Sequence, residues 1–175
     1  MAVYFLVMGV VFPDALSFTE KRETAPFFVT SQEKKSISSN ESFDFIIDTG
    51  ITGGDSDMLI LIIGFPDAKS FDGIKIKSSD FTQSPKFFEV GDEIKTYYPS
   101  DYKIAEYPLL HIFNMPNPIN KKPILQLEIT PENLGEYRIF TKAKSAPFTE
   151  DSIFPKGGNV DEDNEFVDKK VIIDE

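Results

Sequence analysis

Apolar and polar positions alternate with a period of two in the segment from Ile124 to Ala143. Leu125, Leu127 and Ile129 alternate with polar residues, and the turn residues Pro131-Glu132-Asn133 follow. From Tyr137 onwards, Ile139, Thr141 and Ala143 again share one parity. Alternation, a turn and renewed alternation predict two half-buried strands joined at a corner.

The rest of the chain is typical of an all-β domain. Met58–Ile63 is a short continuous apolar run, which predicts a central strand buried on both faces. Clusters of Gly, Pro, Asn, Asp and Ser separate the other short apolar runs, and no long amphipathic helical pattern or internal repeat is present. We expect a mostly antiparallel β-sandwich, whose strand order the pattern leaves open. The predicted strands are Phe27–Thr30, Ser42–Asp48, Met58–Gly64, Gly73–Lys77, Phe87–Val90, Glu93–Tyr98, Leu109–Asn114, Ile124–Thr130, Gly135–Lys142 and Phe166–Ile173.

The corner segment Pro131–Tyr137 resembles the E–F corner of immunoglobulin-like domains, where a Tyr near the start of strand F bonds back to the backbone. Antibody domains have Cys two residues later, where this chain has Ile139, and they have a Trp that this chain lacks. The chain is therefore similar to the Cys-free immunoglobulin-like modules of bacterial and archaeal secreted and cell-surface proteins. The resemblance implies that Tyr137 is a structural corner residue and that Phe166–Ile173 is the last strand. It also implies a structural, adhesion or assembly role.

The N-terminal segment Ala2–Phe12 is entirely apolar apart from Gly9. As a helix it would span only about 16 Å, half of a membrane's hydrocarbon core. No Lys or Arg precedes it, so a signal peptide fits poorly. Three alternatives are open for this segment: a buried strand of the domain, the remnant of a cut membrane segment or an atypical signal, and an arm that pairs with another subunit. We divide the chain into an N-terminal strand or arm with a charged link, 1–24, and a sandwich domain with an acidic C-terminal strand region, 25–175.

The chain is acidic, with a formal net charge of −11 and a sequence pI near 4.6. This balance argues against binding to nucleic acid, which needs clustered Lys and Arg, and against docking on anionic membranes. The absence of Cys excludes disulfides, thiolate metal ligands and Cys nucleophiles. Secreted eukaryotic domains of this size usually carry disulfides, so a prokaryotic source is favoured. We expect an extracellular or cell-surface location, with the cytoplasm as the alternative.

One string resembles an enzyme signature. Phe45–Thr52, FIIDTGIT, is similar to the Asp-Thr-Gly element of aspartic proteases, in which two carboxylates share one proton. Asp48 would be one of the two carboxylates. The chain has no second such element, so a homodimer would be required, and Ile51 replaces the expected small residue. The alternative is that the string is a strand that ends in a turn.

Three further features are weighed against simpler explanations. Asp55 and Asp57 form one weak calcium candidate, and Asp161, Asp163 and Glu165 form another, although solvated acidic loops explain both. Asn40-Glu41-Ser42 is a glycosylation sequon, which has meaning only in a secreted protein. The single His, His111, should face away from Leu110 and Ile112 as a surface or lightly satisfied residue rather than a catalytic one.

The function that we expect is a non-enzymatic structural, adhesion or assembly module. The aromatic pairs Phe27-Phe28, Phe87-Phe88 and Tyr97-Tyr98 should place one ring on each sheet face, and outward rings would suit protein or carbohydrate contacts. Partners would be a protein or a cell-surface polymer. The alternatives are a filament subunit that donates Ala2–Phe12 as a strand, an acid protease that uses Asp48, and a carbohydrate- or calcium-binding domain. No cofactor is expected other than calcium.

Overall fold

The computed structural model describes residues 25–32, 34–95, 102–146 and 167–175. These residues form strands joined by turns and short loops, and no helix is present among them. The strands are β1 (Ala25–Gln32), β2 (Ser36–Ser38), β3 (Phe43–Thr52), β4 (Met58–Gly64), β5 (Ile74–Ser79), β6 (Lys86–Phe88), β7 (Glu93–Lys95), β8 (Tyr102–Ile104), β9 (Leu109–Asn114), β10 (Ile124–Ile129), β11 (Gly135–Ala146) and β12 (Val167–Asp174).

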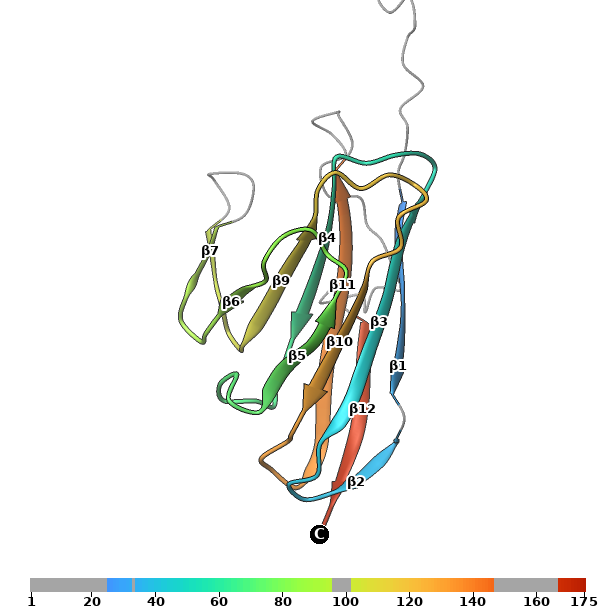
Figure 1. Cartoon of the computed structure of the whole chain (residues 1–175). Coiled ribbons are helices and arrows are strands. Elements are labelled where there is room, and N and C mark those ends of the chain that lie inside the picture. The colour runs from blue at the N-terminus through green and yellow to red at the C-terminus, as the bar shows by residue number, and fades with distance from the viewer. Residues whose placement is uncertain (1–24, 33, 96–101, 147–166) are drawn as a thin grey trace, which may run out of the picture.

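Two sheets lie face to face (Figure 1). The four-stranded sheet has the order β1-β3-β10-β5, and the six-stranded sheet has the order β2-β12-β11-β4-β9-β6. In immunoglobulin-like domains the corresponding sheets are A-B-E-D and C-F-G, which β1-β3-β10-β5 and β4-β11-β12 reproduce. The chain departs from this scheme after β5, because it returns to the six-stranded sheet to form β6 and β9 before it enters β10. The predicted immunoglobulin-like β-sandwich is therefore confirmed.

The alternating apolar positions of both sheets meet in one core. Phe45, Ile47, Leu125 and Leu127 enter it from the four-stranded sheet, and all four are fully buried. Leu61, Ile63, Leu110, Ile112 and Ile139 enter it from the six-stranded sheet, with the same burial. The corner between β10 and β11 brings the two sheets together, as the alternation of residues 124–143 predicts.

Strand β4 is buried on both of its faces, as predicted for a continuous apolar run. It lies between β11 and β9, and Leu59, Leu61 and Ile63 point into the main core. Met58 and Ile60, on its other face, form a second buried cluster with Phe113. The β7–β8 hairpin adds Ile94 and Ala105 to a third cluster on the same outer face. Several apolar positions that face outwards on the six-stranded sheet are therefore covered.

The structure corrects several predicted strand bounds. Strand β3 does not stop at Asp48 but continues to Thr52, because Thr49 points inwards and its Oγ1 donates a hydrogen bond to the Pro123 carbonyl at 2.7 Å. Strand β11 likewise continues to Ala146, paired with β4. Strand β6 ends at Phe88 rather than Val90, since a turn with Gly91 at a φ of 93° follows.

Two short strands were missed altogether. Strand β2 runs parallel to the end of β12, and β8 pairs with β7. The predicted extension of β7 beyond Lys95 and the apolar segment Ala2–Phe12 lie outside the described residues. Within the part of the chain that the structure describes, no helix is long and apolar enough to cross a membrane.

Candidate functional site

The outer face of the four-stranded sheet is the most distinctive surface of the described residues. Its composition follows from the alternation of β1, β3, β10 and β5, since every second side chain of a strand points away from the core. Strand register then fixes which outward side chains are neighbours. Val29 and Ile124 are the register partners of Asp48 on its two sides, and Phe27 is the partner of Gly50.

One half of this face is apolar and exposed. Phe27 is 38% exposed, Val29 60% and Ile124 39%, and all three surround the exposed carboxylate of Asp48. We call these four residues the apolar patch. Large apolar side chains that are exposed singly are common on protein surfaces, whereas several that adjoin one another mark interaction sites.

Gly50 determines how the ring of Phe27 lies. A Cβ atom at position 50 would be only 2.5 Å from Phe27 Cζ, so the ring occupies the space that a side chain would otherwise fill. The glycine of the Asp-Thr-Gly string therefore lets an aromatic ring lie across the strand. Phe28, the next residue, packs against the core, so this aromatic pair places one ring on each sheet face as predicted.

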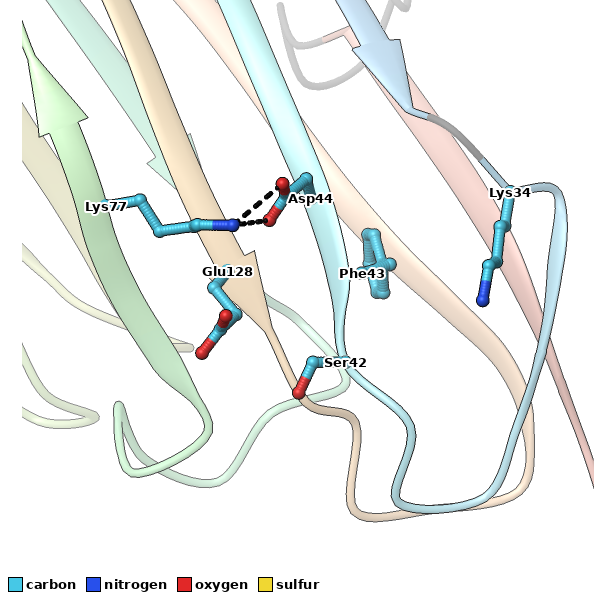
Figure 2. Close-up of a pocket in the computed structure, with 6 residues that line it drawn as sticks. All are labelled: Lys34, Ser42, Phe43, Asp44, Lys77 and Glu128. Carbon is cyan, nitrogen blue, oxygen red and sulfur yellow. Dashed lines mark hydrogen bonds and ion pairs between the residues drawn. The ribbon is translucent and has the colours of Figure 1, made fainter.

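The other half of the face is polar and surrounds a hollow of ≈ 220 Å³ (Figure 2). Lys77 Nζ donates to both carboxylate oxygens of Asp44 at 2.9 Å, and Gln126 Nε2 donates to one of them at 2.9 Å. The ammonium group of Lys77 is the main cause that lowers the pKa of Asp44. Glu128 lies 4.0 Å from Lys75. Each charged side chain that lines this hollow therefore has a partner of opposite charge, because Lys34 pairs with Glu41.

Asp48 is the exception to this matching. Among the described residues, no hydrogen-bond or ion-pair partner of its carboxylate is present. The two lysines of β5 are already paired, Lys77 with Asp44 and Lys75 with Glu128. The face therefore combines an unmatched negative charge with the apolar side chains of Val29 and Ile124 on either side.

The structure places the protease-like string in the middle of a paired strand. Asp48, Thr49 and Gly50 are all paired with β1, and Asp48 is also paired with β10. Thr49 and Gly50 have structural roles here, in the bond to Pro123 and in the seat of the Phe27 ring. A protease would still need the second carboxylate of a homodimer, so the protease stays a prediction.

The two calcium candidates differ in what the structure describes. Asp55 already accepts a hydrogen bond from the Ile119 backbone N–H at 2.7 Å, and Asp57 is exposed. No group of three metal-ligating side chains is found within residues 25–32, 34–95, 102–146 and 167–175. Asp161, Asp163 and Glu165 lie outside those residues. Calcium binding stays a prediction, and a Ca²⁺-dependent rise in melting temperature that EGTA reverses would test it.

The remaining candidates have clear positions. Asn40 is exposed in the turn between β2 and β3, with a φ of 63°, and its glycosylation is still a prediction. Tyr137 lies near the start of β11, and its buried ring meets Phe43 edge-on at 6.5 Å. Burial, followed by the charges of Asp67 and Glu132, raises the pKa of Tyr137. That the Tyr137 hydroxyl bonds back to the backbone, as in a tyrosine corner, stays a prediction.

His111 faces away from Leu110 and Ile112, as predicted, and it is half-buried. Its ring packs against Phe88 at 4.8 Å between centroids. Burial is the main cause that lowers its pKa from 6.5 to about 4, and the positive charges of Lys144 and Lys86 add to this effect. The imidazole is therefore neutral at physiological pH.

Sequence reasoning found Asp48 and Phe27 but not the patch that joins them. It also missed the pairing of Asp44 with Lys77. The alternation along each strand could have predicted that Val29 on β1 and Ile124 on β10 face outwards. The register that brings these strands to Asp48 was not readable from the sequence.

Comparison with known proteins bears on the fold alone. No family model matches the chain, and no curated protein matches it. Similar solved structures include the CARDB domain of the PF1109 protein from Pyrococcus furiosus, in complex with di-metal ions, at 10% identity over 86% of this chain and 91% of that chain, with a TM-score of 0.43. They also include AvmM, which catalyses macrocyclization in alchivemycin A biosynthesis, at 17% identity over 89% and 90%, with a TM-score of 0.40. A third is the collagen-binding domain of a Staphylococcus aureus adhesin, at 7% identity over 83% and 97%, with a TM-score of 0.39. Function therefore has to be argued from the site.

Proposed function

We propose that this chain is a non-enzymatic protein-binding module, with an adhesion or assembly role outside the cell or at its surface. The single observation that supports this is the apolar patch, in which Phe27 and Val29 on β1 and Ile124 on β10 lie on the two sides of Asp48 on an open sheet face. Burial of such side chains by a partner would gain roughly 25 cal/mol per Å² of apolar surface, against the cost of association.

Other exposed apolar side chains of the described residues support the choice of this face. Val90, Met115, Ile119 and Leu134 lie singly in turns and loops, and Phe87, Ile104 and Ile172 lie singly on three different strands, where they need no explanation. The patch instead lies on three paired strands, which hold its side chains in fixed positions. Rigid apolar anchors of this kind are typical of the residues that dominate protein interfaces.

A selection experiment tests the proposal. The full chain is panned against a random 15-residue peptide library, and selected peptides are measured by fluorescence polarisation against Val29→Ser and Ile124→Ser. Leu134→Ser and Ile172→Ser are the matched controls, since both remove an exposed apolar side chain elsewhere. We expect the two patch variants to weaken binding about tenfold or more and the controls to leave it unchanged.

Two results would contradict the proposal. One is a set of peptides that bind the patch variants as tightly as the wild type, or no selected peptide at all. The other is a peptide-cleaving activity of the chain. If pepstatin inhibits this activity and Asp48→Ala abolishes it, the result would support the aspartic protease instead. Circular dichroism of each variant confirms that it is folded.

A further inference from the structure

We infer that the partner bound by the apolar patch places a basic side chain, Lys or Arg, on Asp48, with aliphatic side chains on both sides of it. This inference rests on the proposed function and names the chemistry of the partner. It follows from the position of one carboxylate within an apolar surface.

The surroundings of the Asp48 carboxylate favour pairing with a cation of another molecule. Its neighbours in the register, Val29 and Ile124, are apolar, and no cation of the described residues pairs with it. Any protein that covers Val29 and Ile124 must also remove water from the carboxylate between them. A carboxylate that loses its water without gaining a partner is strongly unfavourable, so only a partner with a matching cation binds well.

The charges elsewhere on the face support the same choice. Asp44 is held by Lys77 and Glu128 adjoins Lys75, so among the residues that the structure describes on this face Asp48 carries the unmatched charge. The chain as a whole has a formal net charge of −11, which attracts basic partners over long range and opposes stacking of a second copy on this face. A basic partner is therefore favoured over self-association.

The inferred contact has a defined geometry. Aliphatic side chains of the partner would cover Val29 and Ile124, and its cation would reach Asp48 between them. The Phe27 ring, held over Gly50, borders the same surface and suits the planar guanidinium of Arg, which stacks on aromatic rings. We therefore expect Arg to be preferred to Lys.

The inference is tested in two steps. The peptides selected above are sequenced, and the charges of Asp48 and of the basic peptide residue are then reversed. We expect Arg or Lys next to aliphatic residues in the peptides whose binding depends on Val29 and Ile124. Asp48→Asn should weaken these peptides roughly tenfold or more, and Asp48→Lys should do so further. A peptide in which the basic residue is replaced by Glu should bind Asp48→Lys better than it binds the wild type. Glu89→Lys, the same charge change at an exposed site near β6, is the control and should have little effect.

The possible failures are distinguishable. Peptides that depend on Val29 and Ile124 but contain no basic residue, or that bind Asp48→Asn as well as the wild type, would overturn this inference and leave the proposed function standing. Aromatic peptides without charge would be one such result. Binding that is indifferent to Val29→Ser and Ile124→Ser would overturn both.

Discussion

Arg138 donates three hydrogen bonds to the carboxylate of Asp67. Its backbone N–H and its Nε reach Oδ2 at 2.8 and 2.9 Å, and its Nη2 reaches Oδ1 at 2.8 Å. Arg138 belongs to β11, whereas Asp67 lies in the connection that follows β4. The pair therefore fastens a loop to a central strand, and the hydrogen bonds from Arg138 are the main cause that lowers the pKa of Asp67.

Asp67→Asn should lower the free energy of unfolding by about 1–2 kcal/mol at neutral pH. The value is modest because both side chains are partly exposed to solvent, which screens the pair. Since folding lowers the pKa of Asp67, this stabilisation is present above the ordinary pKa of Asp and is lost as the pH falls through the folded-state value. Urea unfolding of wild type and variant measures the difference. Glu136→Gln removes the exposed pair with Lys170 and should change stability by less than about 0.5 kcal/mol.

His111 should make stability depend on pH between about 4 and 6.5. The folded protein keeps it neutral down to about pH 4, whereas the unfolded chain takes up a proton below about 6.5. The unfolded state therefore binds more protons in this range, and the free energy of unfolding falls as the pH falls, by on the order of 3 kcal/mol in all. His111→Gln should reduce this slope, as measured by urea unfolding at pH 7, 5.5 and 4.5. An equal slope in wild type and variant would contradict the assignment.

The central strands were the most predictable part of the fold. β4 and β9 have the predicted bounds, since each is a run of apolar residues with turn residues on both sides. β2 and β8 were not predicted, because each is held by pairing with a neighbouring strand, which the sequence does not show. Ser36–Ser38 forms a strand only because Ile172–Asp174 offers a parallel edge to it.

The site was predictable only in pieces. The string around Asp48 attracted attention for its likeness to a catalytic signature, and a single carboxylate says nothing of what surrounds it. Val29 and Ile124 reach Asp48 from distant parts of the sequence through strand register, and a shift of one residue would turn every side chain to the other face. That register depends on packing of the whole sandwich, which no local pattern contains.

Asn114 should stabilise the end of the sandwich at which β9 ends. It is fully buried at the end of β9, where its Nδ2 donates to Asn117 Oδ1 at 2.7 Å and its Oδ1 accepts from the Thr82 backbone N–H at 3.2 Å. Asn114→Ala would leave the buried Asn117 Oδ1 and the part-buried Thr82 N–H without that partner, so we expect a loss of about 1–3 kcal/mol in unfolding free energy. Urea unfolding measures the loss. Gln83→Ala, at a nearby exposed position, should stay within about 0.5 kcal/mol of wild type, and an equal effect of both would contradict the prediction.

Gly50→Ala should be unfavourable only while Phe27 is present. The new Cβ would come within 2.5 Å of Phe27 Cζ, so the exposed ring must swing away, at an expected cost of about 1 kcal/mol. In a Phe27→Ala background the same substitution should cost little or stabilise the strand, because Ala loses less backbone entropy than Gly. Unfolding of the four proteins of this double-mutant cycle gives the coupling energy, which is expected to be about 1 kcal/mol. Gly73→Ala is the contrasting case, since its Cβ would lie 2.4 Å from the backbone oxygen of Thr130, which no side-chain truncation removes. A Gly50→Ala cost that is the same in both backgrounds would mean that Phe27 does not lie over Gly50 in solution, and the apolar patch would lose its aromatic member.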